Sequence, residues 1–197
     1  MAQVTLHTPI SEEDVRKLEI GDVVYITGTI YTSRDMGHLR IKQALDEGES
    51  LPVDFKGGVI FHAGPVVKKH DDRWELVVIG PTTSIRMEPY ADMIASLGVR
   101  VIIGKGGMAE RSSQAFQKYG MVYLQAAPGC AVKLAGGVEQ VESVHWIELG
   151  IPEALWVLKV KEFGPLVVAM DSKGRSIYRD LKEQAEAKIA AMFPEDQ

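Results

Sequence analysis

Four short segments of the chain combine hydroxyl, imidazole and cationic side chains with glycine or proline. They are residues 27–35, 61–65, 80–86 and 104–107. The last three directly follow apolar runs that the sequence predicts to be strands. In open α/β sheets, ligands bind beyond the carboxyl ends of the strands. These segments are therefore where we expect a binding or catalytic site.

The third segment, Gly-Pro-Thr-Thr-Ser-Ile-Arg, has the composition of an anion site. We expect the backbone N–H groups of Thr82 to Ile85 to face outward at the N-terminus of the helix that follows, where the helix dipole favours negative charge. The planar guanidinium of Arg86 would add a fork of donors for a carboxylate or phosphate. The alternative is that Thr83 or Ser84 caps the helix and Arg86 is only solvated.

The fourth segment places Lys105 between glycines, just after a buried strand. Close backbone approach together with a point charge suits an anion. The segment is not a nucleotide-binding P-loop, because Gly106 stands where such a loop has serine or threonine. The alternative is a tight turn that carries an exposed lysine.

The first segment ends in Arg34 and Asp35 at the start of a predicted helix, with His38 one turn further on. Asp35 is a candidate helix cap, whereas a cation such as Arg34 is unfavourable at a helix N-terminus unless it serves an anion. His38 could face the same side as Arg34. The alternative for His38 is an imidazole packed against the helix or exposed on its surface.

Metal binding by this chain alone is not expected. The isolated His38, His62 and His145 lack the spacing of a zinc site. The single cysteine, Cys130, cannot form an internal disulfide or hold an iron–sulfur cluster by itself. Its neighbours are apolar and include no base, so we interpret Cys130 as a small buried hydrophobic residue.

Length and composition describe an ordinary globular chain. The 197 residues are 46% hydrophobic and 25% charged, with 22 Lys plus Arg against 27 Asp plus Glu. The net charge of −5 argues against the broad basic surface of nucleic-acid-binding proteins. No signal-like region begins the chain, and no apolar run approaches the roughly 20 residues of a membrane helix. We therefore expect a cytoplasmic protein that binds neither nucleic acid nor membrane.

Hydrophobic periodicity predicts the elements that must position these segments. Strands are predicted at residues 23–27, 59–61, 76–79, 99–103, 121–124, 141–147, 156–160 and 166–170, and helices at residues 11–18, 34–47, 87–97 and 111–119. The last segment carries Leu181, Ala185, Ile189 and Met192 at helical spacing, as an amphipathic helix does. Residues 76–125 alternate strand and helix, which indicates parallel strands covered by helices. We predict one α/β domain over residues 1–197, with a mixed sheet and helices packed on it.

Taken in order, the four segments resemble one enzyme family. Thr-Gly-Thr leads to Arg-Asp-x-x-His at residues 34–38, followed by Phe-His-Ala-Gly-Pro, by Gly-Pro-Thr-Thr-x-x-Arg-Met and by Lys-Gly at residues 105–106. This series resembles the β subunit of class I fumarate hydratase and the C-terminal half of its single-chain forms. The β subunit of L(+)-tartrate dehydratase is similar. The resemblance extends from about residue 5 to about residue 175.

The resemblance implies a swivelling β/β/α domain and the reversible hydration of fumarate to (S)-malate. The family uses a [4Fe–4S] cluster held by three cysteines of the α part, and one iron is left open for the substrate hydroxyl. The single cysteine of this chain agrees with that division. The resemblance therefore implies that an α subunit carries the cluster and completes the active site, in an α₂β₂ assembly or with a homodimer of this chain.

The resemblance also implies roles for individual residues. Thr82 matches the residue that takes the C3 proton of malate, and Arg34, Arg86 and Lys105 match residues that bind the substrate carboxylates and hydroxyl. Thr83 and His38 match motif positions at the substrate. The three cations, Arg34, Arg86 and Lys105, are local positive charges in an acidic chain. They suit a dianion that gains negative charge during the reaction. A threonine hydroxyl is a poor base, so Thr82 would need a cationic neighbour or a base from the partner.

Three other functions fit the same residues. The first is an L(+)-tartrate dehydratase β subunit, whose substrate has one more hydroxyl than malate. The second is a non-enzymatic module that binds an anion or nucleotide at segments 80–86 and 104–107. The third is a structural subunit in which the tryptophan-bearing surface contacts a partner.

Overall fold

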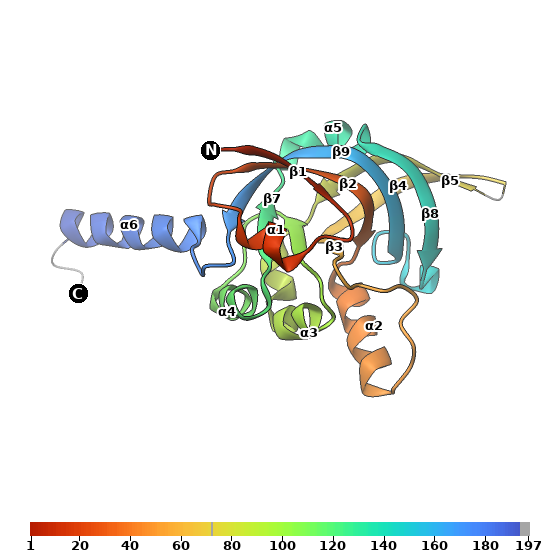
Figure 1. Ribbon diagram of the computed structural model, residues 1–197, viewed down its shortest axis with the longest axis horizontal. Coiled ribbons are helices and arrows are strands. Elements are labelled where there is room, and N and C mark those ends of the chain that lie inside the picture. The colour runs from red at the N-terminus through yellow and green to blue at the C-terminus, as the bar shows by residue number, and fades with distance from the viewer. Residues whose placement is uncertain (72, 194–197) are drawn as a thin grey trace.

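The computed structural model describes residues 1–71 and 73–193 (Figure 1). The strands are β1 (Gln3–His7), β2 (Val23–Thr32), β3 (Val59–Phe61), β4 (Ala63–His70), β5 (Arg73–Pro81), β6 (Val101–Gly104), β7 (Val122–Gln125), β8 (Val138–His145) and β9 (Leu155–Met170). The α-helices are α1 (Glu12–Arg16), α2 (Asp35–Asp46), α3 (Ala91–Ser96), α4 (Glu110–Tyr119), α5 (Ala131–Ala135) and α6 (Ile177–Met192). Short 3₁₀ helices are η1 (Ser84–Tyr90), η2 (Pro128–Cys130) and η3 (Ile147–Leu149).

A seven-stranded mixed sheet forms the centre of the described chain, in the order β1-β2-β3-β6-β7-β9-β8. Strands β1, β2, β3, β6 and β7 run parallel, and β9 runs antiparallel to β7 and β8. Strand β9 also pairs with β2, so β2, β3, β6, β7 and β9 close into a ring. The predicted α/β fold with a mixed sheet is confirmed.

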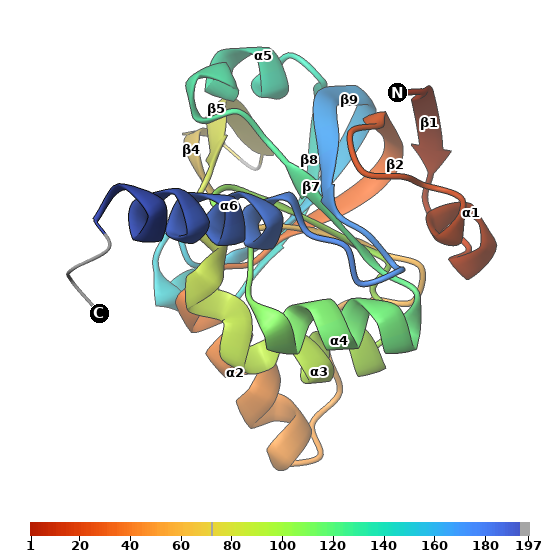
Figure 2. The same cartoon turned by 90° about the vertical axis from the view of Figure 1, so that its left-hand side faces the viewer.

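Both faces of the central parallel strands are buried, as their continuous apolar runs require. In β3, Val59 and Phe61 pack into the hydrophobic cluster enclosed by the strands, whereas Ile60 packs into a second cluster with side chains of α3 and α4. Successive side chains of a strand point to opposite faces, and β6 and β7 repeat the pattern. Helices α2, α3 and α4 lie together beneath the strands (Figure 2).

The expected strand-helix alternation over residues 76–125 is wrong in its first member. Residues 76–79 belong to β5, which pairs antiparallel with β4 in a separate two-stranded sheet. This hairpin projects from the body (Figure 1). Exposed and half-buried residues alternate from Arg73 to Val78, the pattern of a strand with one solvated face. Because residues 76–79 are all apolar, the sequence does not show that alternation.

Three other expected elements differ in the structure. Residues 156–160 and 166–170 are one 16-residue strand, β9, which crosses from β8 to β7 while pairing with β2. The expected helix 87–97 is divided, because Pro89 lies in a 3₁₀ turn and α3 begins at Ala91. The strand expected at 141–147 ends at His145, because Trp146 adopts a left-handed conformation with φ of 58°.

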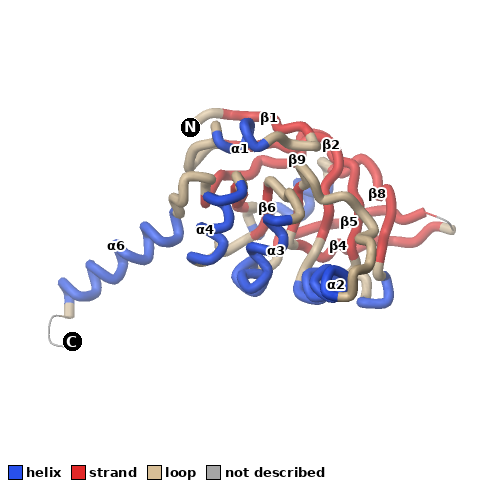
Figure 3. The backbone as a smooth tube through the Cα atoms, turned by 60° about the horizontal axis from the view of Figure 1, so that its bottom comes forward, coloured by secondary structure: helices blue, strands red, loops and turns tan. Residues whose placement is uncertain are grey.

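The terminal helix α6 forms as the sequence predicts and begins earlier, at Ile177. It extends away from the sheet (Figures 1 and 3), and its apolar side chains Leu181, Ile189 and Met192 are 61%, 59% and 70% exposed. The apolar face of α6 is therefore not packed on the sheet of its own chain. No helix in the described part of the chain is long and apolar enough to cross a membrane.

Candidate active site

Three of the polar segments meet where the sheet and the hairpin come together. The N–H of Thr82 donates to the carbonyl of His62 at 2.7 Å, which joins the end of β5 to the end of β3. The N–H of Lys105 donates to Thr82 O at 3.2 Å, and the N–H of Ser84 donates to Lys105 O at 3.0 Å. Segments 61–65, 80–86 and 104–107 are thus fixed to one another by backbone hydrogen bonds, as expected from their places after strands.

The predicted backbone anion site is wrong in part. Two of its N–H groups, those of Thr82 and Ser84, donate to carbonyl oxygens and are not free for a ligand. The capping alternative is wrong as well, because Thr83 makes no side-chain cap and Ser84 is fully buried. The Ser84 hydroxyl instead lies 2.9 Å from His62 Nδ1 and accepts from the Tyr123 hydroxyl at 3.0 Å.

Arg86 is the side chain that connects the first segment to the third. Its Nη2 donates to Thr82 Oγ1 at 3.1 Å and pairs with Asp35 Oδ2 at 2.9 Å. The Arg86 and Asp35 side chains are 44% and 39% exposed. Arg86 is therefore held in place and not merely solvated, and a guanidinium lies directly against the hydroxyl of Thr82.

Arg34 occupies the N-cap position of α2 without capping it, and its guanidinium pairs with Glu153 at 3.2 Å. The other Glu153 oxygen accepts from the backbone N–H of Met36 at 3.0 Å, so Glu153 satisfies a donor of the first helical turn. The guanidinium packs on Gly64, where a Cβ atom would lie 2.9 Å from Nη1. Glu153 was missed in the sequence, because nothing near residue 153 marks it as a partner of Arg34.

Two buried imidazoles lie beneath these charges. The rings of His38 and His62 are 5.2 Å apart, and each residue is 1% exposed. His38 Nδ1 lies 2.9 Å from both the Ser33 hydroxyl and the Arg34 carbonyl. Burial lowers the pKa of His38 to about 4, and burial together with nearby His38 and Arg86 lowers the pKa of His62 well below its usual value. Both rings are therefore neutral near pH 7, and His38 points inward as a supporting group.

Lys105 completes the set of cations. Its side chain is half-buried, and no carboxylate of the described residues lies within ion-pair distance. Gly104 before it must lack a side chain, because a Cβ atom there would lie 1.9 Å from Ser84 Oγ. Thr83, beside Thr82, is exposed. Arg34, Arg86 and Lys105 are thus brought to one end of the parallel strands, an arrangement suited to a ligand with two negative charges.

Metal ligands do not converge in the described part of the chain. No group of three His, Cys, Asp or Glu side chains there is arranged to hold an ion. His145 lies 3.2 Å from the Ser143 hydroxyl on β8, separate from the buried histidine pair. Cys130, expected to be buried, is half-buried in η2.

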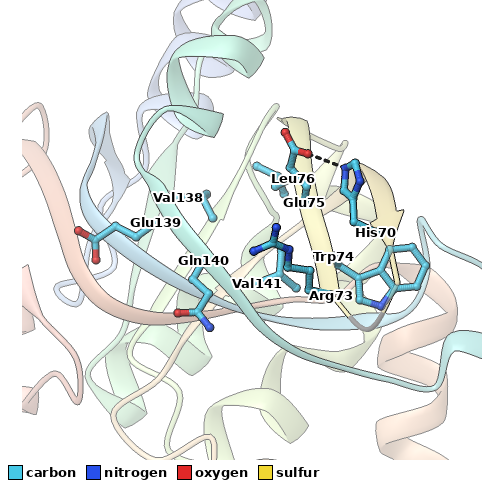
Figure 4. Close-up of a pocket in the computed structure, with 9 residues that line it drawn as sticks. All are labelled: His70, Arg73, Trp74, Glu75, Leu76, Val138, Glu139, Gln140 and Val141. Carbon is cyan, nitrogen blue, oxygen red and sulfur yellow. Dashed lines mark hydrogen bonds and ion pairs between the residues drawn. The ribbon is translucent and has the colours of Figure 1, made fainter.

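A cavity of about 530 Å³ lies elsewhere, between the hairpin and β8 (Figure 4). It is lined from β5 by Arg73, Trp74, Glu75 and Leu76, from β4 by His70, and from β8 by residues 138–141. His70 and Glu75 pair across the hairpin at 2.8 Å, and Trp74 packs edge-to-face on Trp156 with ring centroids 5.2 Å apart. None of the sequence-predicted site residues lines this cavity.

Comparison with known proteins gives consistent matches. The family model described as Fumarase C-terminus matches residues 1–181. The chain is 45% identical over 179 residues to the L(+)-tartrate dehydratase subunit beta of Escherichia coli K12, covering 90% of this chain and 88% of that protein. It is 47% identical over 182 residues to a Methanocaldococcus jannaschii protein provisionally given the same name, covering 91% of this chain and 93% of that protein.

A longer relative also matches. The chain is 46% identical over 189 residues to a Geobacillus stearothermophilus protein provisionally named class I fumarate hydratase. The match covers 95% of this chain and 36% of that protein. The same sequence unit therefore occurs as a separate subunit and as part of a longer chain.

Proposed function

The chain belongs to the fumarase C-terminus family, and from this premise we propose that it is the substrate-binding β subunit of a hydro-lyase that interconverts fumarate and (S)-malate. The coarser assignment, a β subunit of the fumarate hydratase and tartrate dehydratase type, follows from relatives at 45–47% identity over most of the chain. The observation that carries the proposal is the contact of Arg86 with Thr82 beside Arg34 and Lys105.

The three cations provide what a dicarboxylate needs. Fumarate and malate carry two carboxylates, and Arg34 and Arg86 offer planar forks that match carboxylate geometry. Lys105 adds a compact charge on the adjacent loop. As a proton leaves C3 of malate, negative charge builds beside one carboxylate, and cations already in place stabilise that charge without reorganising. Thr83 and His38 belong to the same proposed site, Thr83 at its surface and His38 beneath it.

We propose that the Thr82 oxygen takes the C3 proton as an alkoxide, after its own hydroxyl proton has passed to a base of the partner subunit or to solvent. An isolated threonine hydroxyl is too weak an acid to act as a base at neutral pH. The Arg86 Nη2 donates to this oxygen at 3.1 Å, and a cationic donor favours the deprotonated form of its acceptor. This contact supplies the cationic neighbour that the proposed role of Thr82 requires.

The described residues do not fit an iron–sulfur cluster. A [4Fe–4S] cluster of this family needs three cysteine ligands, and the sequence has one cysteine. No group of three candidate metal ligands exists among the described residues. We therefore propose that a partner α subunit carries the cluster and covers the exposed side of the Thr82 site.

A tartrate dehydratase β subunit is an equally supported second function. The E. coli and M. jannaschii relatives carry that name, whereas the Geobacillus relative carries the fumarate hydratase name. Segments 104–108 and 145–150 also resemble the tartrate form. The substrates differ by one hydroxyl at C3, which a site with a matching polar group can distinguish strongly.

The test is anaerobic co-expression with a cluster-bearing α subunit, followed by assays with malate, fumarate and L-tartrate. We expect turnover that requires both subunits, and the ratio of kcat/KM values identifies the substrate. Activity with none of the three would overturn the enzyme assignment. If the chain alone bound phosphate ligands tightly, the anion-binding module would be supported instead, and dispensable Thr82, Arg86 and Lys105 would support a structural subunit.

The remaining proposals concern the assembly and its location. We propose that residues 1–197 act as one domain in a cytoplasmic α₂β₂ enzyme, because one cysteine suits a reducing compartment. The exposed apolar face of α6 is available for contact between subunits. Size-exclusion chromatography with light scattering on the co-expressed complex measures the stoichiometry.

A further inference from the structure

The Nη2 atom of Arg86 lies between two partners. One is Thr82 Oγ1 at 3.1 Å, and the other is Asp35 Oδ2 at 2.9 Å. A hydrogen bond to Thr82 and an ion pair with Asp35 at the same nitrogen restrict the rotation of the whole guanidinium plane. The described residues provide no ion-pair or hydrogen-bond partner for Nε and Nη1, which remain free for a ligand carboxylate.

Asp35 is not used for any other task in the described chain. It is the first residue of α2, and the N-cap position, held by Arg34, makes no side-chain cap. The backbone donor of the first turn at Met36 is satisfied by Glu153 instead. The Asp35 side chain lies at the positive end of the twelve-residue helix α2. An acidic residue in the first turn of a helix ordinarily stabilises that helix through its charge. Asp35 instead pairs with Arg86.

Stability does not explain the Asp35–Arg86 pair. Both side chains are more than one-third exposed, and such pairs contribute little to the free energy of unfolding. The groups beneath them, His38 and His62, are neutral near pH 7, because burial lowers both pKa values. The only charged side chain in contact with Asp35 is therefore that of Arg86, among the residues that the structure describes.

We propose that Asp35 is a positioning residue of the active site, which acts by holding Arg86 Nη2 against the hydroxyl of Thr82. The inference rests on the proposed function, because it holds that the contact of Arg86 with Thr82 activates the Thr82 oxygen. Without the Asp35 carboxylate, the Arg86 side chain can rotate to bind substrate and leave Thr82 without its donor. Substrate would still bind, and the proton step would slow.

The experiment uses the complex with the cluster-bearing subunit and the Asp35→Asn, Arg86→Gln and double variants. We expect Asp35→Asn to lower kcat about tenfold or more, with KM changed less than about threefold, because positioning acts on the proton step. In the Arg86→Gln background, Asp35→Asn should change kcat less than about twofold, because residues that act through one another are not additive. Asp35→Glu should restore part of the lost rate.

The matched control is Asp46→Asn, which removes the same charge from the other end of α2, where Asp46 pairs with Lys42. It should leave kcat, KM and the melting temperature unchanged, and circular dichroism should show equal folding for all variants. Equal kcat values for Asp35→Asn and wild type, or a full additional loss in the Arg86→Gln background, would overturn the inference. If Thr82→Ala retained full activity, the proposed role of Thr82 would fail first, so the two failures are distinguishable.

Discussion

Two regions of this molecule combine surface accessibility with polar side chains, and they differ in how they are built. The Thr82 site takes its side chains from segments at residues 34–38, 62, 82–86 and 105, and backbone hydrogen bonds fix three of these segments together. The cavity between the hairpin and β8 has a volume of about 530 Å³, and it is lined by His70 and residues 73–76 of the hairpin and by residues 138–141 of β8. The Thr82 site is therefore distinguished by polar loops that are hydrogen-bonded to one another, and not by concavity.

The charges of the two regions differ in the same way. At the Thr82 site, Arg34 and Arg86 are each held by one carboxylate, and Lys105 is left without an ion-pair partner among the described residues. At the cavity, His70 and Glu75 pair with each other on the exposed hairpin. The first region therefore carries positive charge for an anionic ligand, and its exposed side is where we propose that the α subunit binds.

Among the variants that compare the two regions, the largest effect is expected at Lys105. The Lys105→Met substitution keeps the length of the side chain and removes its charge, so kcat/KM of the complex should fall about 100-fold, or about 3 kcal/mol of transition-state stabilisation. The control is Lys69→Met on the hairpin, where the ammonium lies 5.5 Å from the Trp74 ring. If the two variants lost equal amounts of activity, the distinction between the regions would be wrong.

The buried His38 of the Thr82 site should link the stability of the fold to pH. His38 has a folded-state pKa of about 4 against an ordinary value of 6.5, so the unfolded chain binds more protons between these pH values. The free energy of unfolding should fall as pH falls through this window, by up to about 3 kcal/mol for His38. His38→Gln should flatten that dependence in urea denaturation. An unaltered slope in His38→Gln would contradict the account.

Glu153 tests how far the positioning of Arg34 matters for binding. Glu153→Gln keeps an oxygen for the Met36 N–H and removes the charge that holds Arg34, so KM should rise about tenfold with a smaller change in kcat. The matched control is Glu148→Gln in the nearby exposed turn η3. Steady-state assays of both complexes measure the effect, and an unchanged KM in Glu153→Gln would show that Arg34 is held without Glu153.

The smallest effect is expected at the cavity itself. Arg73→Gln removes its guanidinium, and kcat/KM should change less than about twofold, because Arg73 lines the cavity and no residue of the Thr82 site does. The same assay under the same conditions measures it. A loss comparable to that of Lys105→Met would place part of the active site at the hairpin.

That the polar loops lie close together could be predicted from the sequence. The residues that their side chains contact could not. Apolar runs at residues 59–61, 101–103 and 122–124 are long enough to be read as buried strands, and parallel strands bring their carboxyl ends together. The contacts of Glu153 with Arg34 and of Tyr123 with Ser84 join residues 119 and 39 positions apart. No local pattern encodes such pairs, because tertiary packing creates them.

The predicted secondary structure differs most from the observed fold at a short apolar run and at a Gly-Pro pair. The run at residues 76–79 has the composition of a buried parallel strand, yet it lies in the half-exposed hairpin. Four consecutive apolar residues do not indicate which face of a strand is exposed to solvent, so the sequence could not distinguish the two. The Gly-Pro pair at residues 164–165 predicts a loop between two strands, whereas β9 continues through it. The pairing of β9 with β2 and β7 outweighs the local preference.

The most direct test of the central claim compares Thr82→Ser with Thr82→Val in the reconstituted complex at equal cluster content. Serine keeps the hydroxyl that accepts from Arg86, whereas valine keeps the shape and removes the oxygen. The account predicts that Thr82→Ser stays within about tenfold of the wild-type kcat and that Thr82→Val loses about 1,000-fold or more. Equal kcat values for the two variants would contradict it, because the Thr82 oxygen would then take no part in the reaction.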